Sequence, residues 1–202
     1  MGFSICKQSL ILLVAIFQLT LNPIFIHSAI TPQSSSSSST EFIKTSCSST
    51  TYPRLCFSSL SLHATSIQTS PRLLATAALS VSISSVKSAT TQILKLSHAH
   101  GLSPRDVSAL NDCLEELGDS IDSLISSISE MPKLRGNDFD VVMSNIQTWV
   151  SAALTDETTC SEGFQGKTVN GGIKAAVRSK IVNIAQLTSN AISLINRIAE
   201  LH

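Results

Sequence analysis

Four long segments of this chain repeat apolar residues at steps of three and four, the spacing of one face of an α-helix. They cover residues 72–99, 104–129, 138–162 and 172–200. A narrow apolar stripe does not hold a single helix together in water, so the four stripes are expected to face one another. Aromatic residues make up only 4% of the sequence, and no clear alternating apolar runs indicate strands. The predicted fold is therefore all-α, an up-down-up-down four-helix bundle.

The stripes also predict the core of this bundle. Trp149, the only tryptophan, lies on the third stripe and is expected to point inward. The predicted core positions are Leu79, Ile83, Val86, Thr90 and Ile93; Val107, Leu110, Leu114, Leu117, Ile121, Leu124 and Ile128; Phe139, Val142, Ile146, Trp149 and Ala153; and Val177, Ile181, Ile184, Thr188, Ala191, Ile195 and Ile198.

Helix-terminating residues separate the segments. A serine followed by a proline, at Ser70 and again at Ser103, is typical of a helix start, and Gly101 between them is typical of a helix end. Each helix has about 25 residues, nearly 40 Å at a rise of 1.5 Å per residue. Helices of matched length with short connections favour antiparallel neighbours.

The N-terminal region is predicted to be a signal peptide over residues 1–29. Lys7 precedes an apolar run over Ser9–Leu21, and small residues follow at Ser28 and Ala29. The run is shorter than the ~20 residues that span a bilayer, and no later segment is expected to do so. The mature protein is therefore expected to be secreted.

The remainder of the chain divides into a short arm and one folded domain. Residues 30–40 are rich in serine and are expected to form a disordered arm. Residues 41–202 form the predicted domain, with a helical hairpin over 41–62 and the bundle over 70–202.

Loss of Cys6 with the signal peptide leaves four cysteines, an even number that indicates two disulfides in a secreted chain. Three pairings are possible. Cys47 and Cys56 are nine residues apart, which suits a small hairpin. Cys113 is early in the second helix and Cys160 is late in the third, so antiparallel packing would bring these two side by side. A zinc site is the weaker alternative, because no Cys-x-x-Cys sequence is present.

The charges argue against several classes of function. The 14 basic and 14 acidic residues cancel, whereas a nucleic-acid-binding protein needs a basic surface. No serine lies in a Gly-x-Ser-x-Gly sequence, and His98 and His100 do not share a helical face. We therefore expect no catalytic residues, no metal and no cofactor. Five carboxylates fall off the second stripe and are interpreted as a solvated face rather than as a metal or acid/base site: Asp112, Glu115, Glu116, Asp119 and Asp122.

Three sequence features together resemble the plant invertase and pectin methylesterase inhibitor family. They are the Cys47–Cys56 spacing, the sequence Asn-Asp-Cys-Leu-Glu-Glu over 111–116, and Thr-Trp-Val-Ser-Ala-Ala-Leu-Thr-Asp-Glu-Thr-Thr-Cys-Ser-Glu-Gly-Phe over 148–164. The resemblance covers residues 41–202. It implies a four-helix bundle with an N-terminal hairpin, with the first cysteine paired to the second and the third to the fourth.

The family has two functional branches, and the resemblance favours the one that inhibits pectin methylesterases. Invertase inhibitors have a Pro-Lys-Phe motif about 16 residues before the fourth cysteine, where this chain has Val142-Val-Met-Ser-Asn145. The resemblance implies a 1:1 complex in the plant cell wall (the apoplast), in which bundle helices cover the enzyme's active-site cleft. The alternatives are an inhibitor of acid invertase and a non-inhibitory extracellular binding protein.

Helical periodicity, not a motif, predicts the residues that contact the partner. They are polar positions off the stripes of the first and third helices: Lys87, Ser88, Thr91, Gln147, Ser151 and Thr155.

Overall fold

A computed structural model describes residues 33–165 and 170–202, which form one compact unit. The predicted signal peptide and the first residues of the predicted arm lie outside this range. Every regular element among the described residues is a helix. The all-α prediction is confirmed.

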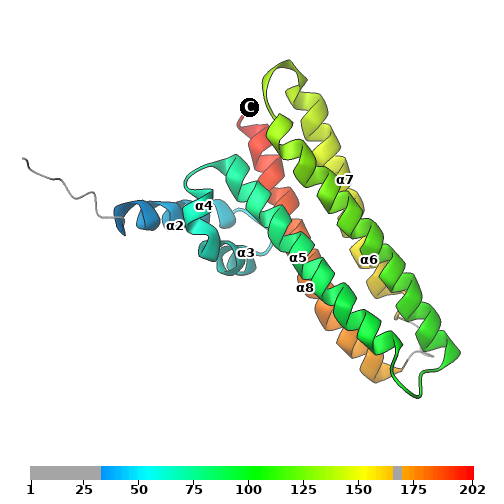
Figure 1. The fold of residues 1–202 in the computed structure, drawn as a ribbon. Coiled ribbons are helices and arrows are strands. Elements are labelled where there is room, and N and C mark those ends of the chain that lie inside the picture. The colour runs from blue at the N-terminus through cyan, green and yellow to red at the C-terminus, as the bar shows by residue number, and fades with distance from the viewer. Residues whose placement is uncertain (1–32, 166–169) are drawn as a thin grey trace, which may run out of the picture. The chain divides into compact units, whose positions relative to one another are not determined.

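Four long helices form the bundle: α5 (Pro71–Ser97), α6 (Pro104–Glu130), α7 (Phe139–Glu162) and α8 (Gly171–Glu200). They run up and down in sequence order, as Figure 1 shows. α5 packs against α6 and α8, and α7 packs against the same two helices. α5 and α7 are therefore diagonal to each other, as are α6 and α8.

Side-chain caps hold the helix ends where the sequence predicts them. Ser70 accepts a hydrogen bond from the Leu73 amide at the start of α5. Ser103 and Asp106 form a reciprocal capping box at the start of α6. Asp106 Oδ1 also accepts from the Asn170 amide at 2.8 Å, which ties the start of α6 to the start of α8. Gly101, between α5 and α6, has a φ of +80°, a conformation that glycine adopts without strain.

The bundle core contains most of the predicted stripe residues, but the placement of Trp149 was wrong. Its side chain is 42% exposed, whereas Val150 is fully buried. A step of four from Ile146 leads to Val150 and then to Ala153, and this row faces the core. One residue is a rotation of about 100° on a helix, so Trp149 lies on the flank of α7 beside that row.

Four short helices form the N-terminal unit: α2 (Gln33–Cys47), α3 (Pro53–Leu60), the 3-10 turn η1 (Ser61–His63) and α4 (Ala64–Ile67). The predicted hairpin is present but extends beyond residues 41–62 in both directions. The predicted disorder is wrong for residues 33–40, which are the first part of α2. Serine costs a helix only about 0.5 kcal/mol relative to alanine, and the packing of the buried Ile43 and Cys47 lets the helix extend backward through the serines.

Hydrogen bonds attach this unit to α8. The side chain of Asn190, 2% exposed, accepts from the Tyr52 amide at 2.9 Å and donates to the Tyr52 carbonyl at 3.1 Å. Near the end of α8, Arg197 Nη1 donates to Ser49 Oγ at 2.9 Å. The hairpin is therefore fixed to the bundle through the loop between α2 and α3.

By length and composition, α5 is apolar enough to cross a membrane, which the sequence analysis did not anticipate. Its apolar side chains have another explanation in this fold. Leu74, Leu79, Val86 and Ile93 are at most 1% exposed and pack in the bundle core. A core helix that is buried along one side and rich in serine on the other has this composition.

Two disulfides are present, as the sequence predicts. Cys47–Cys56 closes the hairpin between α2 and α3, and Cys113–Cys160 joins α6 to α7. The second bridge spans 47 residues and the first spans nine.

Loop length predicts that the two bridges differ in their contribution to stability. Loop-closure entropy gives about 4 kcal/mol for the Cys113–Cys160 bridge and about 2.5 kcal/mol for Cys47–Cys56. Replacing both cysteines of the longer bridge by serine should lower the melting temperature by roughly 10 °C, with a smaller fall for the shorter bridge. Circular dichroism melts of the two double variants test this order, and the reverse order would contradict it.

Candidate functional site

The six predicted contact residues lie in two groups on diagonal helices. Lys87, Ser88 and Thr91 are exposed on α5. Ser151 and Thr155 are exposed on α7, and Gln147 is half-buried there. Because α5 and α7 do not neighbour each other, the two groups do not form one α5–α7 surface.

Helix α8 connects the two groups. From the α7 group, Gln147 Nε2 donates to Asn196 Oδ1 on α8 at 3.0 Å. From the α5 group, Ser88 lies on the side of its helix that faces α8, where it lines a groove. Ser88 and Gln147 therefore lie beside α8, on opposite sides of that helix.

The threonine hydroxyls in both groups donate their protons to their own helix. Thr91 Oγ1 donates to the Lys87 carbonyl at 3.0 Å, and Thr155 Oγ1 donates to the Ser151 carbonyl at 2.9 Å. A hydroxyl oxygen bonded in this way keeps its lone pairs free. These positions therefore offer acceptors to the donors of a partner.

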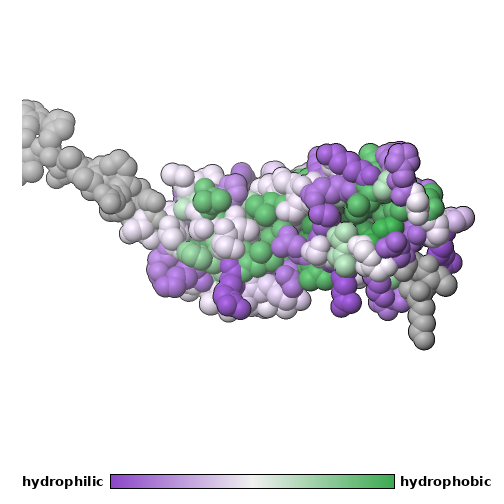
Figure 2. All heavy atoms as spheres, turned by 90° about the horizontal axis from the view of Figure 1, so that it is seen from below, coloured by the Kyte–Doolittle hydropathy of each residue, from purple (hydrophilic) through white to green (hydrophobic). Residues whose placement is uncertain are grey.

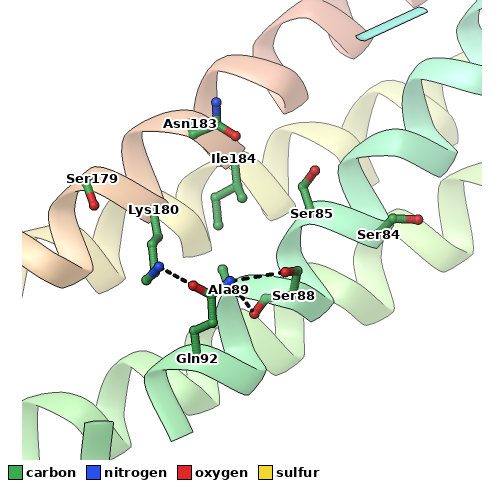
Figure 3. Close-up of a pocket in the computed structure, with 9 residues that line it drawn as sticks. All are labelled: Ser84, Ser85, Ser88, Ala89, Gln92, Ser179, Lys180, Asn183 and Ile184. Carbon is green, nitrogen blue, oxygen red and sulfur yellow. Dashed lines mark hydrogen bonds between the residues drawn. The ribbon is translucent and has the colours of Figure 1, made fainter. Parts of the chain in front are cut away.

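A groove of about 460 Å³ runs between α5 and α8, shown in Figure 3. We call it the α5–α8 groove and define it by Ser84, Ser85, Ser88, Gln92, Lys180 and Asn183. Lys180 reaches across it and donates to Gln92 Oε1, while Gln92 Nε2 donates to Ser88 Oγ at 3.2 Å. Sequence reasoning found Ser88 but missed the rest, because the register between α5 and α8 has no motif that reveals it.

The outer surface mixes polar and apolar side chains without a strong division between them. Figure 2 shows this on one face, where weakly polar side chains separate apolar ones. The large apolar side chains with the greatest exposure among the described residues are Leu62, Val141 and Leu201. They belong to different elements, so they are scattered positions rather than one apolar patch.

The acidic run on α6 is solvated, as interpreted from the sequence. Four of its carboxylates are exposed and Glu116 is half-buried. The pKa of Asp156 on α7 is raised above its ordinary value. The larger cause is partial burial, and the negative charges of Glu116 and Asp119 add to it. Among the described residues, no group of three His, Cys, Asp or Glu side chains is placed to hold a metal ion.

Glu157 is a buried carboxyl group that the sequence analysis did not single out. Its Oε1 accepts from Ser120 Oγ of α6 at 3.0 Å and from Thr188 Oγ1 of α8 at 2.8 Å, so it joins three helices. Its Oε2 makes no hydrogen bond within the described part of the chain. Burial raises the pKa of Glu157 to about 7, although the two hydroxyl donors oppose that rise. Its position in the sequence could have revealed its burial. Glu157 is four residues after Ala153 and three before Cys160, and both of these lie on the buried side of α7.

The buried Glu157 predicts a stability that falls as the pH rises. Its pKa in the folded protein is about 7 and the ordinary value is 4.5, so the folded protein binds the proton more tightly. The contribution of this group to the free energy of unfolding is therefore fully present below pH 4.5 and is lost as the pH rises through about 7, a decrease on the order of 3 kcal/mol. Urea denaturation between these pH values measures the change.

Glu157→Gln should remove most of that pH dependence, because glutamine does not titrate. Glu162→Gln is the matched control, an exposed glutamate on the same helix. A Glu157→Gln variant that retained the full decrease in stability would show that another group causes it.

The fold is that of a helical bundle stabilised by two disulfides. The sequence model of the protein family described as "Plant invertase/pectin methylesterase inhibitor" matches residues 41–194. Pectinesterase inhibitor 9 of Arabidopsis thaliana is 41% identical over 199 residues, which are 96% of this chain and 95% of that protein. Pectinesterase inhibitor 11 of the same plant is 45% identical over 163 residues, 79% of this chain and 81% of that protein. A "21 kDa protein" of Daucus carota is 50% identical over 165 residues, 80% of this chain and 86% of that protein.

A solved structure has the same fold. The crystal structure of a pectin methylesterase inhibitor from Arabidopsis thaliana aligns with a TM-score of 0.54 and 19% identity, over 77% of this chain and 95% of that one. The chain belongs to the plant invertase/pectin methylesterase inhibitor family, and it is not an enzyme.

Proposed function

We propose that this protein inhibits a plant pectin methylesterase. The observation that carries the proposal is the similarity to two proteins named pectinesterase inhibitors, at 41% and 45% identity over most of the chain. The protein would be secreted to the cell wall through the signal peptide predicted over residues 1–29. There it would regulate the methylesterification of pectin.

Inhibition would occur by occlusion of the active-site cleft in a 1:1 complex. The structure supports this mechanism through rigidity: two disulfides join helices, and Glu157 bonds to two neighbouring helices. An inhibitor that is already rigid before it binds loses little conformational entropy on binding. The contact residues would be Lys87, Ser88 and Thr91 on α5 and Gln147, Ser151 and Thr155 on α7.

Inhibition of an acid invertase is the second candidate, because the family description includes both activities. The absence of Pro-Lys-Phe upstream of Cys160 and the names of the relatives favour the methylesterase. A bundle that binds an extracellular partner without inhibiting an enzyme is the remaining possibility.

Titration of the mature protein separates these functions. We expect near-stoichiometric loss of pectin demethylation by a purified plant pectin methylesterase, and no loss of sucrose hydrolysis by an acid invertase. Both assays should be run at acidic and at neutral pH. Inhibition of the invertase alone would overturn the proposal, and inhibition of neither enzyme would favour the non-inhibitory binding role.

Arginine substitutions map the contact surface. Ser88→Arg on α5 and Thr155→Arg on α7 place a large charged side chain in each of the two predicted contact groups, and at least one should weaken inhibition by about tenfold or more. Ser108→Arg, an exposed serine near the start of α6, is the control and should leave inhibition unchanged. If only the control variant lost inhibition, the contact surface would lie on α6.

A further inference from the structure

The charges of this bundle are divided between its two halves, although their sum is zero. Only two of the 14 acidic residues, Glu41 and Glu200, lie outside residues 106–162, the segment of α6 and α7. The only basic residues between positions 106 and 165 are Lys133 and Arg135. α5 contains no acidic residue, and α8 contains none before Glu200. The α5–α8 side of the bundle is therefore cationic.

The cations of α8 concentrate in its first half, beside two hollows. Lys180 lines the α5–α8 groove (Figure 3). A second hollow of about 350 Å³ lies between α8 and the end of α7, where Lys174 and Arg178 line it with Ser161 and Gln165. Lys174 and Lys180 are about 9 Å apart along the helix axis and about 120° apart around it, so they line hollows on different sides of α8.

Within the described part of the chain, no ion pair neutralises these cations. The ion pairs among the described residues are Lys44–Glu41 and Lys133–Glu130, and neither includes a residue of α8. Lys174 Nζ donates to the Gln165 carbonyl at 3.2 Å and Lys180 donates to the Gln92 amide oxygen, so both have neutral partners. The nearest acidic side chain in sequence to the second hollow is Glu162, which is exposed at the end of α7. The first half of α8 thus retains positive charge for an external anion.

We propose that the first half of α8, with the two hollows beside it, binds a linear polyuronate, a polysaccharide with a carboxylate on each sugar ring. The carboxylates would pair with Lys174, Arg178 and Lys180. The sugar hydroxyls would exchange hydrogen bonds with the Ser88 hydroxyl and the Gln92 and Asn183 amides of the groove, which are both donors and acceptors. This binding goes beyond the proposed inhibition and does not require it.

The lining favours a polysaccharide over a nucleic acid. Proteins that bind single strands add aromatic side chains on which bases stack. Among the described residues, Phe164 is the one aromatic residue that lines either hollow, and it is 2% exposed and packs in the core. The cations are also few and separated by neutral hydroxyls and amides, in contrast to the dense basic surface that neutralises a phosphate backbone.

The test measures binding of the mature protein to fully de-esterified polygalacturonate, with highly methyl-esterified pectin as the uncharged counterpart. We expect binding to the de-esterified polymer at about 0.05 M salt and its loss at about 0.5 M, because exposed charges are screened. The double variant Arg178→Gln, Lys180→Gln should bind about tenfold more weakly, the combined effect of two ion pairs at the surface. Circular dichroism verifies that the variant folds.

The matched control is Arg54→Gln, Arg135→Gln, which removes the same charge from exposed positions outside α8. It should bind the polymer as the unmodified protein does. Equal weakening by both double variants would overturn the proposal, because net charge would then explain the binding. Equal binding of the methyl-esterified polymer, equal binding of a single-stranded oligonucleotide, or no binding at low salt would each overturn it as well.

Discussion

The antiparallel seam between α6 and α7 is the contact on which the rest of the bundle depends. Three pairs tie it along its length: the Cys113–Cys160 disulfide, the Ser120 hydroxyl on Glu157, and the Ser127 hydroxyl on the Ile146 carbonyl at 3.4 Å. The pairs occur at nearly constant register, so the helices cannot slide without breaking all of them. Thr188 of α8 donates to the same Glu157 oxygen, which extends the constraint to α8.

Sequence periodicity predicted the helices and most of the core because burial imposes the helical period on the sequence. The caps at Ser70 and Ser103 are local and could be recognised from a few residues. Trp149 was misplaced because steps of three and four both fit a stripe, and only packing distinguishes Trp149 from Val150. The start of α2 was missed because a serine run has little helical preference of its own, and its helicity depends on the packing of Ile43 and Cys47.

The candidate surface was less predictable than the fold for a physical reason. The groove between α5 and α8 depends on which residues of the two helices lie side by side along the bundle axis. Lys180 and Gln92, for example, are 88 residues apart in the sequence. Lys180 and Gln92 meet across it, yet neither has a sequence neighbour that marks the contact. The diagonal placement of α5 and α7 likewise follows from chain order around the bundle, and it separates residues that periodicity alone had grouped together.

Acid has opposite effects on the buried Glu157 of this protein and on the polysaccharide proposed to bind it. Protonation of Glu157 stabilises the fold as the pH falls below about 7, because the buried carboxyl is then neutral. An anionic polysaccharide instead loses its charge as the pH approaches an ordinary carboxyl pKa of about 4, while lysine and arginine remain positive. A stable bundle and a charged polymer therefore coexist best in mildly acidic solution, between these two limits. Within that interval the cationic side of the bundle is available to the polymer, and the neutral hydroxyls exposed on α5 and α7 are unaffected by pH.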